Sequence, residues 1–396
     1  MALFRSPTRA VAAALCCAAV LLAGCGPAGD GTAGDGTAEH GGPGDPVVRQ
    51  LLERRADAVL GHDEKAYLAD VTPARHAAER QVFRNLEELP LASWSYRLVS
   101  TEGADPVTAR VQLRYRLGGY DSTPVTTDES LLLRADGTGR WRVAGDGDPG
   151  GLLWEQGPLH VVRGSHSLVL GTGDRTELAG YATDADRAVP QVRRAWGGQG
   201  WTGRVVLEVP SSLRRMGQLL DAPAQTYAGV AAVTTGEVGG SGSVPAGRVI
   251  VNPEAFAGLS AFGRQVVLTH ETTHVATRAA TTSRTPLWLS EGFADWVAYR
   301  DSGRTAASLA PELRRDVTAS GPPGHLPADS DFAPGAPAQA QAYEGAWLAC
   351  RLIADTWGAD RLVALYRSGA DLRGTLGIDG DAFTERWRAY VKGELG

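Results

Sequence analysis

The sequence predicts an α+β protein with two domains. N-terminal helices precede a curved antiparallel sheet, and further short strands then precede a mostly helical region. The chain has 396 residues, 43% of them hydrophobic, which is enough for two packed cores. Apolar residues recur first with the period of a helix and then with that of a strand, and both patterns return later in the chain. A formal net charge of −6 provides no overall basic surface, which excludes nucleic acid as a partner.

Residues 1–24 are predicted to be an export signal. Arg5 and Arg9 precede an uncharged apolar run over residues 10–24, which is shorter than the roughly 20 residues of a membrane-spanning helix. The run ends in L-A-G-C at residues 22–25 and resembles the lipobox of bacterial lipoproteins. This resemblance implies that Cys25 carries lipid and anchors the chain to the cell membrane, facing outside the cytoplasm. The alternative is an ordinary secretion signal with a chance cysteine.

Residues 25–46 are predicted to be a tether. Residues 26–46 contain eight glycines and no large apolar side chain, so they cannot bury enough surface to order themselves. Once the signal is removed and Cys25 is lipidated, Cys350 is the one cysteine left, which excludes an intrachain disulfide. The apolar neighbours of Cys350 predict that its side chain is buried.

Residues 47–150 are expected to form the first domain. Asp45 and Pro46 mark a helix start, and shorter helices are expected near residues 64–69 and 74–86. Strict alternation over residues 107–117 predicts a half-buried strand, and runs at 94–98, 126–134 and 140–143 complete an antiparallel meander. Helices followed by a curved sheet resemble the nuclear transport factor 2-like cone over residues 47–147.

Residues 155–396 are expected to form the second domain. Short apolar runs predict strands at residues 159–163, 167–170, 204–209 and 248–252, with a helix over 176–196. Helices are also expected over 261–279 and from residue 285 onward. Residues 303–396 are predicted to be mostly helical, ending in a helix at 383–395.

The strongest functional signal is H-E-T-T-H at residues 270–274. Residues four apart on a helix differ by about 40° of rotation and about 6 Å of rise, so His270 and His274 can reach one metal ion. Glu271 is one residue further round and can reach a water at that ion without binding it. A pair of structural helix histidines is the alternative interpretation.

A second helix supplies the third candidate ligand. It carries W-L-S-E-G-F-A-D at residues 288–295, with Pro286 near its start. Glu291 would complete a set of two histidines and one glutamate around a single Zn²⁺, which is the arrangement of catalytic zinc sites. A closed structural site would need a fourth ligand, usually cysteine, and none is free.

These two segments resemble the gluzincin metallopeptidases, the thermolysin-like family. The resemblance covers about residues 155–396 and implies a mixed sheet followed by helices, with the site at their junction. It implies that Glu271 is the general base, that Glu291 completes the zinc site, and that Asp295 accepts a hydrogen bond from the non-ligating nitrogen of His270. An exposed helix acid is the alternative for Asp295. Glu271 would take a proton from a water acidified by zinc and return it to the leaving amine.

The donor that stabilises the oxyanion has two candidates. Tyr343, Glu344 and Gly345 resemble the Y-E-x-G segment of gluzincin aminopeptidases, although the position between Glu344 and glycine is missing here. The resemblance implies that Tyr343 faces the tetrahedral intermediate, while a buried aromatic side chain is the alternative. His325, in a loop rich in proline and glycine, is the rival donor.

The predicted function is that of a lipid-anchored, extracytoplasmic zinc metallopeptidase acting on a peptide or protein substrate. The strand at 248–252 corresponds to an exposed edge strand of the family, so we expect it to pair with extended peptide; a plain inner strand is the alternative. Two other functions stay open: an inactive binding module of the same fold, and a zinc hydrolase of a non-peptide amide or ester. The G-x-M-E-N element of the family's aminopeptidases is absent, which disfavours that activity.

Overall fold

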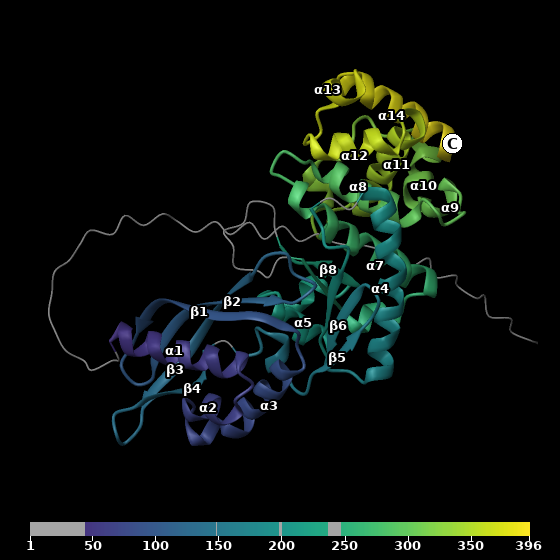
Figure 1. Ribbon diagram of the computed structural model, residues 1–396. Coiled ribbons are helices and arrows are strands. Elements are labelled where there is room, and N and C mark those ends of the chain that lie inside the picture. Colours follow the sequence, from purple (N-terminus) through teal and green to yellow (C-terminus); the bar gives the residue numbers. More distant parts are fainter. Residues whose placement is uncertain (1–43, 148, 198–199, 237–246) are drawn as a thin grey trace, which may run out of the picture.

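The computed structural model describes residues 44–147, 149–197, 200–236 and 247–396 (Figure 1). The expected export signal, Cys25 and residues 26–43 of the expected tether lie outside the described residues. Within the described ranges, no helix combines the length and the apolar character needed to cross a membrane.

The N-terminal part consists of helices followed by a four-stranded antiparallel meander, as the sequence predicts. Its strands lie in the order β1-β2-β3-β4. The first helix begins at Asp45 with Gly44, rather than Asp45, as the capping residue. The elements are α1 (Asp45–Leu60), α2 (Glu64–Ala69), η1 (Pro73–Arg75), α3 (His76–Glu87), β1 (Leu91–Glu102), β2 (Val107–Leu117), β3 (Val125–Ala135) and β4 (Trp141–Asp146).

Alternation of side chains fixes which face of this sheet is buried. Every second residue of β2, from Val107 to Leu117, is buried, while the residues between them are half-buried or exposed. Helix α1 packs against this buried face and contributes Val48, Leu51 and Leu52 to the same core. The antiparallel sheet is therefore confirmed, and the likeness to a nuclear transport factor 2-like cone stays a prediction.

The middle of the chain forms a mixed five-stranded sheet in the order β5-β6-β7-β9-β8. The central strands β6, β7 and β9 are parallel, and β5 and β8 run antiparallel at the two ends. The elements are η2 (Leu153–Glu155), β5 (His160–Arg163), β6 (Ser167–Gly171), α4 (Arg175–Trp196), β7 (Val205–Val209), α5 (Leu213–Leu219), η3 (Ala224–Tyr227), β8 (Ala232–Thr234), β9 (Arg248–Val251) and α6 (Pro253–Ala257).

The expectation that residues 248–252 form an exposed edge strand is wrong. β9 lies between β7 and β8, and all four of its residues are buried. The terminal strand of the described sheet is β8, which pairs antiparallel with β9 from Ala232 opposite Val251 to Thr234 opposite Val249. The physical reason is that a strand with a neighbour on each side and both faces covered has no free edge to offer.

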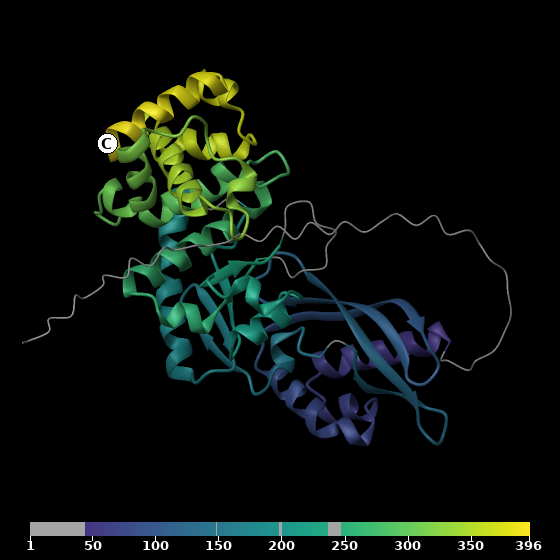
Figure 2. The ribbon, with the colours of Figure 1, turned by 180° about the vertical axis from the view of Figure 1, so that it is seen from behind.

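The C-terminal region is helical, as predicted, and forms the green and yellow part of Figure 2. Its hydrophobic core also includes Val192, Ala195 and Trp196 from the end of α4. Cys350 lies fully buried in this core, as its apolar neighbours predict. The elements are α7 (Ala261–Thr277), η4 (Arg278–Ala280), α8 (Leu287–Tyr299), α9 (Ala306–Leu309), α10 (Pro311–Ser320), η5 (Asp329–Phe332), α11 (Gln339–Trp357), α12 (Ala359–Arg367), α13 (Leu372–Leu376) and α14 (Gly380–Leu395).

Helices α8 and α11 pack unusually closely at Gly292. A Cβ atom at this position would lie 2.2 Å from the carbonyl oxygen of Ala346 and 3.0 Å from Sγ of Cys350. Only a residue without a side chain allows the two backbones to approach this closely. Because Gly292 follows Glu291 directly, this contact also sets the position of Glu291.

The N-terminal part and the mixed sheet share a hydrophobic core. Trp94 and Tyr115 of the first sheet belong to the same buried cluster as Leu168, Leu170 and Val206 of the second. The segment between the two sheets is hydrogen-bonded to α3. The buried side chain of Asn85 on α3 donates to the carbonyls of Trp154 and Gly157, and it accepts from the backbone N–H of Leu159. The two sheets are therefore packed against each other rather than joined by a free linker.

Candidate metal centre

Helix α7 carries the H-E-T-T-H motif between the mixed sheet and helix α8. Ser260 caps its N-terminus by accepting a hydrogen bond from the backbone N–H of Gly263. Val267 and Leu268 pack into the core beneath the sheet. Apolar groups therefore cover the helix on several sides, which explains why the polar motif residues His270 and Glu271 are 1% and 3% exposed.

The three predicted ligands come together at one point. Nε2 of His270 lies 3.0 Å from Nε2 of His274 and 3.2 Å from Oε2 of Glu291. Nε2 of His274 lies 3.6 Å from the same glutamate oxygen. Helix α7 supplies the two imidazoles one turn apart, and α8 brings the carboxylate across the helix interface. These three residues form a group that could hold a metal ion.

Asp295 lies beside the ring of His270. Its Oδ1 atom is 2.9 Å from Nδ1 of His270, and its side chain is buried on α8 one turn after Glu291. A carboxylate accepts a hydrogen bond, so Nδ1 donates its proton to Asp295 and Nε2 is the ring atom that faces Glu291 and His274. Burial alone would lower the pKa of His270, but Asp295 and Glu291 outweigh it and hold that pKa well above its ordinary value.

The donor set fits a divalent metal ion. Oε2 of Glu291 is buried and has no hydrogen-bond partner, although Nε2 of both histidines faces it. Burial opposes ionisation of this carboxyl, but the neighbouring imidazoles His274 and His270 bring its pKa down to about 2. A metal ion that binds here would replace the protons on the two Nε2 atoms and would keep the carboxylate ionised. Two imidazoles and one carboxylate are the ligands of catalytic zinc sites.

Glu271 has a hydrogen-bond partner of its own. The hydroxyl of Thr234, on β8, lies 2.7 Å from Oε2 of Glu271 and 3.0 Å from its carbonyl oxygen. Burial raises the pKa of Glu271 above its ordinary value, while His270, His274 and the Thr234 hydroxyl act in the opposite direction. A direct hydrogen bond therefore joins β8, the terminal strand of the described sheet, to the carboxylate of Glu271.

The two candidate oxyanion donors differ in their surroundings. Tyr343 lies on α11, 5% exposed, with its ring packed edge-to-face against Phe332 at 5.1 Å between centroids. His325 is exposed in the segment between α10 and η5, and its Nδ1 lies 3.0 Å from the carbonyl oxygen of Leu326. Neither placement tests a catalytic role, so both assignments stay predictions.

Sequence reasoning missed the contribution of Thr234. The three-residue strand β8 is too short for an alternating pattern to be recognised. Thr234 comes beside Glu271 only because β8 pairs with β9, next to α7. A single threonine in a short apolar run does not by itself indicate a contact with a residue as distant in the sequence as Glu271.

Comparison of the chain with protein-family models and with curated proteins finds no match. Comparison with solved structures finds a variant of an M1 zinc metallopeptidase from Deinococcus radiodurans, 13% identical with a TM-score of 0.35, over 76% of this chain and 62% of that one. A two-domain M1 zinc metallopeptidase variant bound to L-arginine is 14% identical, with a TM-score of 0.35 over 77% and 63%. A variant bound to a Tyr-Ser-Ala substrate, also from Deinococcus radiodurans, is 13% identical, with a TM-score of 0.34 over 77% and 62%. The chain thus spans less than two thirds of the length of these proteins.

Proposed function

We propose that this chain is a zinc-dependent hydrolase of peptide bonds. The observation that carries the proposal is the convergence of His270, His274 and Glu291 at a buried point, with Glu271 beside them and held by a different partner. Three ligands are one fewer than the four of a structural zinc site. The arrangement therefore suits an ion that takes part in chemistry.

The residues have separate tasks in this proposal. Zinc bound by the three ligands would act as a Lewis acid, which acidifies water and polarises a carbonyl group. Glu271 accepts the proton of the attacking water on its carboxylate and returns it to the leaving amine. Asp295 is a positioning residue that fixes the ring of His270, and Tyr343 is the proposed donor to the oxyanion.

The proposed substrate is an extended peptide that pairs with β8. This strand ends the described sheet, and Thr234 on it contacts Glu271. A peptide that added a further strand beside β8 would bind through backbone hydrogen bonds and lie near Glu271. Binding of this kind gives affinity without strong sequence preference.

The decisive experiment joins metal analysis with peptide cleavage. Purified full-length protein should contain about one zinc per chain by mass spectrometry and cleave members of a fluorogenic peptide library. Glu271→Gln should keep its zinc and lose activity by about 10²–10⁴-fold, because the general base is removed and the ligands are not. Chelation should abolish cleavage, and added zinc should restore it.

Glu177→Gln is the matched control, since Glu177 is an exposed acid in the first turn of α4. Its activity should equal that of the unaltered chain. Full zinc occupancy with no cleavage of any peptide would refute the peptidase proposal and favour a binding module. Cleavage that survives in Glu271→Gln would refute the assignment of the base.

We also propose that the protein is anchored outside the cytoplasm by lipid on Cys25. The support is the L-A-G-C sequence at residues 22–25 after a short apolar run. In a bacterial host, Cys25→Ser should move the protein from the membrane fraction to the soluble fraction, whereas Cys17→Ser, inside the expected signal, should leave it membrane-bound. A Cys25→Ser protein that stays in the membrane fraction would refute the anchor.

A further inference from the structure

The N-terminal domain contains a cavity of about 270 Å³ that belongs to no part of the metal centre. It lies between α1, α3, the four-stranded sheet and the segment that leads to the second sheet, the region drawn in purple and blue in Figure 1. At roughly 30 Å³ per water, this volume corresponds to about nine waters, so a small organic molecule fits. Trp94, Tyr96 and Trp154 provide aromatic walls.

Acidic groups line one part of this cavity. Glu129 on β3 and Glu155 on η2 are both lining residues. Burial is the main cause that raises the pKa of Glu129 to about 8; the charge of Arg55 opposes this rise, and neighbouring carboxylates such as Asp146 add to it. Burial likewise raises the pKa of Glu155 well above its ordinary value. A raised pKa favours the neutral carboxyl while the cavity is empty, so a cation that binds between Glu129 and Glu155 would shift them towards the ionised form with release of their protons. Among the described residues, no salt bridge joins Glu129 or Glu155 to a cationic side chain.

Unsatisfied donors line another part of the cavity. Arg55 is 5% exposed, and its Nη2 atom donates to Glu79 at 2.7 Å and to the hydroxyl of Tyr67 at 2.5 Å. Its Nε and Nη1 atoms have no hydrogen-bond partner. Nε1 of Trp94, a residue that is 4% exposed, likewise has no partner at hydrogen-bonding geometry, although the hydroxyl of Tyr96 lies close enough to act on both Trp94 and Arg55. Buried donors without acceptors cost about 1–3 kcal/mol each, so an acceptor that enters the cavity gains affinity from them.

A metal ion does not explain the combination of acidic groups and unsatisfied donors in this cavity. Within the part of the chain that the structure describes, the one group of ligand atoms close enough to hold an ion is His270, His274 and Glu291. Glu129 and Glu155 belong to no such group of three or more ligand residues in the described part of the chain. A larger organic cation can bridge them and can also contact the aromatic walls.

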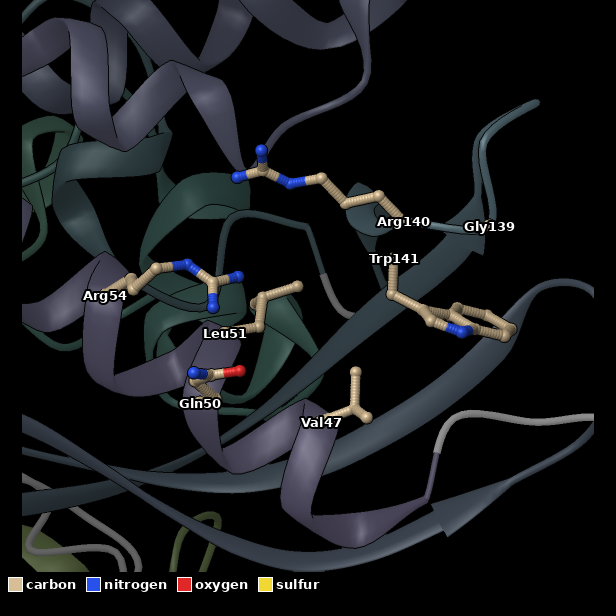
Figure 3. Close-up of a pocket in the computed structure, with 7 residues that line it drawn as sticks. All are labelled: Val47, Gln50, Leu51, Arg54, Gly139, Arg140 and Trp141. Atoms are coloured by element: carbon tan, nitrogen blue, oxygen red, sulfur yellow. The ribbon is translucent and has the colours of Figure 1, made fainter.

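A second hollow of the same domain provides a contrast (Figure 3). There Arg54 and Arg140 turn their guanidinium groups to one side, and Trp141 points away from them. Both arginines bind the buried carboxylate of Asp70, at 2.9 and 3.0 Å for Arg54 and 2.7 Å for Arg140. Their charge is thus paired within the protein, whereas the cavity around Arg55 has donors and carboxylates left over.

We propose that the cavity around Arg55 binds a small zwitterion of the amino acid or short peptide class. Its ammonium group lies between Glu129 and Glu155, and its carboxylate accepts from Arg55 and Trp94. The apolar part of the ligand packs against Trp154 and Tyr96. A molecule with both charges satisfies the two sets of groups at once, which a simple amine or a simple acid does not.

Calorimetric titration of the full-length protein tests this proposal. The probes are free amino acids and dipeptides, and each one that binds is compared with its N-acetyl and its C-terminal amide derivative. Both derivatives should bind at least 10-fold more weakly, because each loses one of the two charges. No binding by any probe at 10 mM would overturn the proposal, and so would equal affinity for a probe and its N-acetyl derivative.

Variants then locate the site. Glu129→Gln and Trp94→Phe should each weaken binding by about 10-fold, while Asp128→Asn, an exposed neighbour on β3, should not change it. Circular dichroism checks that each variant is folded. If Glu129→Gln and Trp94→Phe bind like the unaltered chain, the ligand sits elsewhere, such as at the metal centre, and the proposal is wrong. The derivative comparison needs no variant, so it decides the matter even if a variant fails to fold.

Discussion

Asp295 illustrates how one buried carboxylate organises the candidate metal centre. It binds Nδ1 of His270, so that the other ring nitrogen faces His274 and Glu291. Without this bond, the imidazole would be free to rotate or to carry its proton on Nε2, where the proton would compete with a metal ion. Thr234 acts similarly on Glu271, whose carboxylate accepts a hydrogen bond from its hydroxyl.

We predict that Asp295→Asn lowers zinc affinity by about 10–100-fold, because the ring of His270 loses its charged acceptor and becomes a poorer ligand. Competition with a chelating dye measures this affinity. Asp360→Asn, at an exposed position on α12, should leave it unchanged. If Asp295→Asn binds zinc as tightly as the unaltered chain while circular dichroism shows the same fold, Asp295 has no positioning role.

At the scale of elements, the position of β9 shows how far a strand can be interpreted from its own residues. Arg248–Val251 is buried along its whole length, and such continuous burial is typical of an inner strand of a parallel array. The strand was expected at the edge because it precedes the motif helix, as in the resembling family. The continuous apolar run instead indicates an inner strand, and β8 is the terminal strand of the described sheet.

The packing of α8 on α11 is a second feature that depends on contacts between elements. Gly292 brings the two helices together, and no local pattern distinguishes this glycine from others in the chain. The contact fixes the helix that carries both Glu291 and Asp295. The geometry of the metal centre therefore depends on a helix pair outside the motif.

At the scale of the whole molecule, a buried ion pair joins the two sheets. Arg248 of β9 donates from Nη1 and Nη2 to both oxygens of Asp121, at 2.6 and 2.9 Å, and Asp121 follows β2 of the first sheet. Both side chains are almost fully buried, and Glu208 of β7 lies 3.9 Å from Nε of Arg248. Because β9 pairs with β8, this ion pair connects the N-terminal domain to the strand that holds Glu271.

We predict that Asp121→Asn lowers the free energy of unfolding by about 3–5 kcal/mol, since it leaves the charge of Arg248 buried with a weaker partner. Urea unfolding measures the change. The matched control is Asp301→Asn, which breaks the exposed pair with Arg194 and should cost less than about 1 kcal/mol. Equal effects of the two substitutions would show that the buried pair does not hold the sheets together.

The sequence by itself determined most of the longer elements and the chemistry of the candidate ligands. Helical spacing placed His270 and His274 on one face, alternation predicted the meander, and the apolar stretch around Cys350 predicted its burial, because these depend on residues close together in the chain. Only the tertiary structure decided which strand ends the mixed sheet, that Thr234 holds Glu271, and that Arg55, Glu129 and Glu155 line one cavity. These arrangements join residues far apart in the sequence, and they depend on how helices and sheets pack, which no local pattern records.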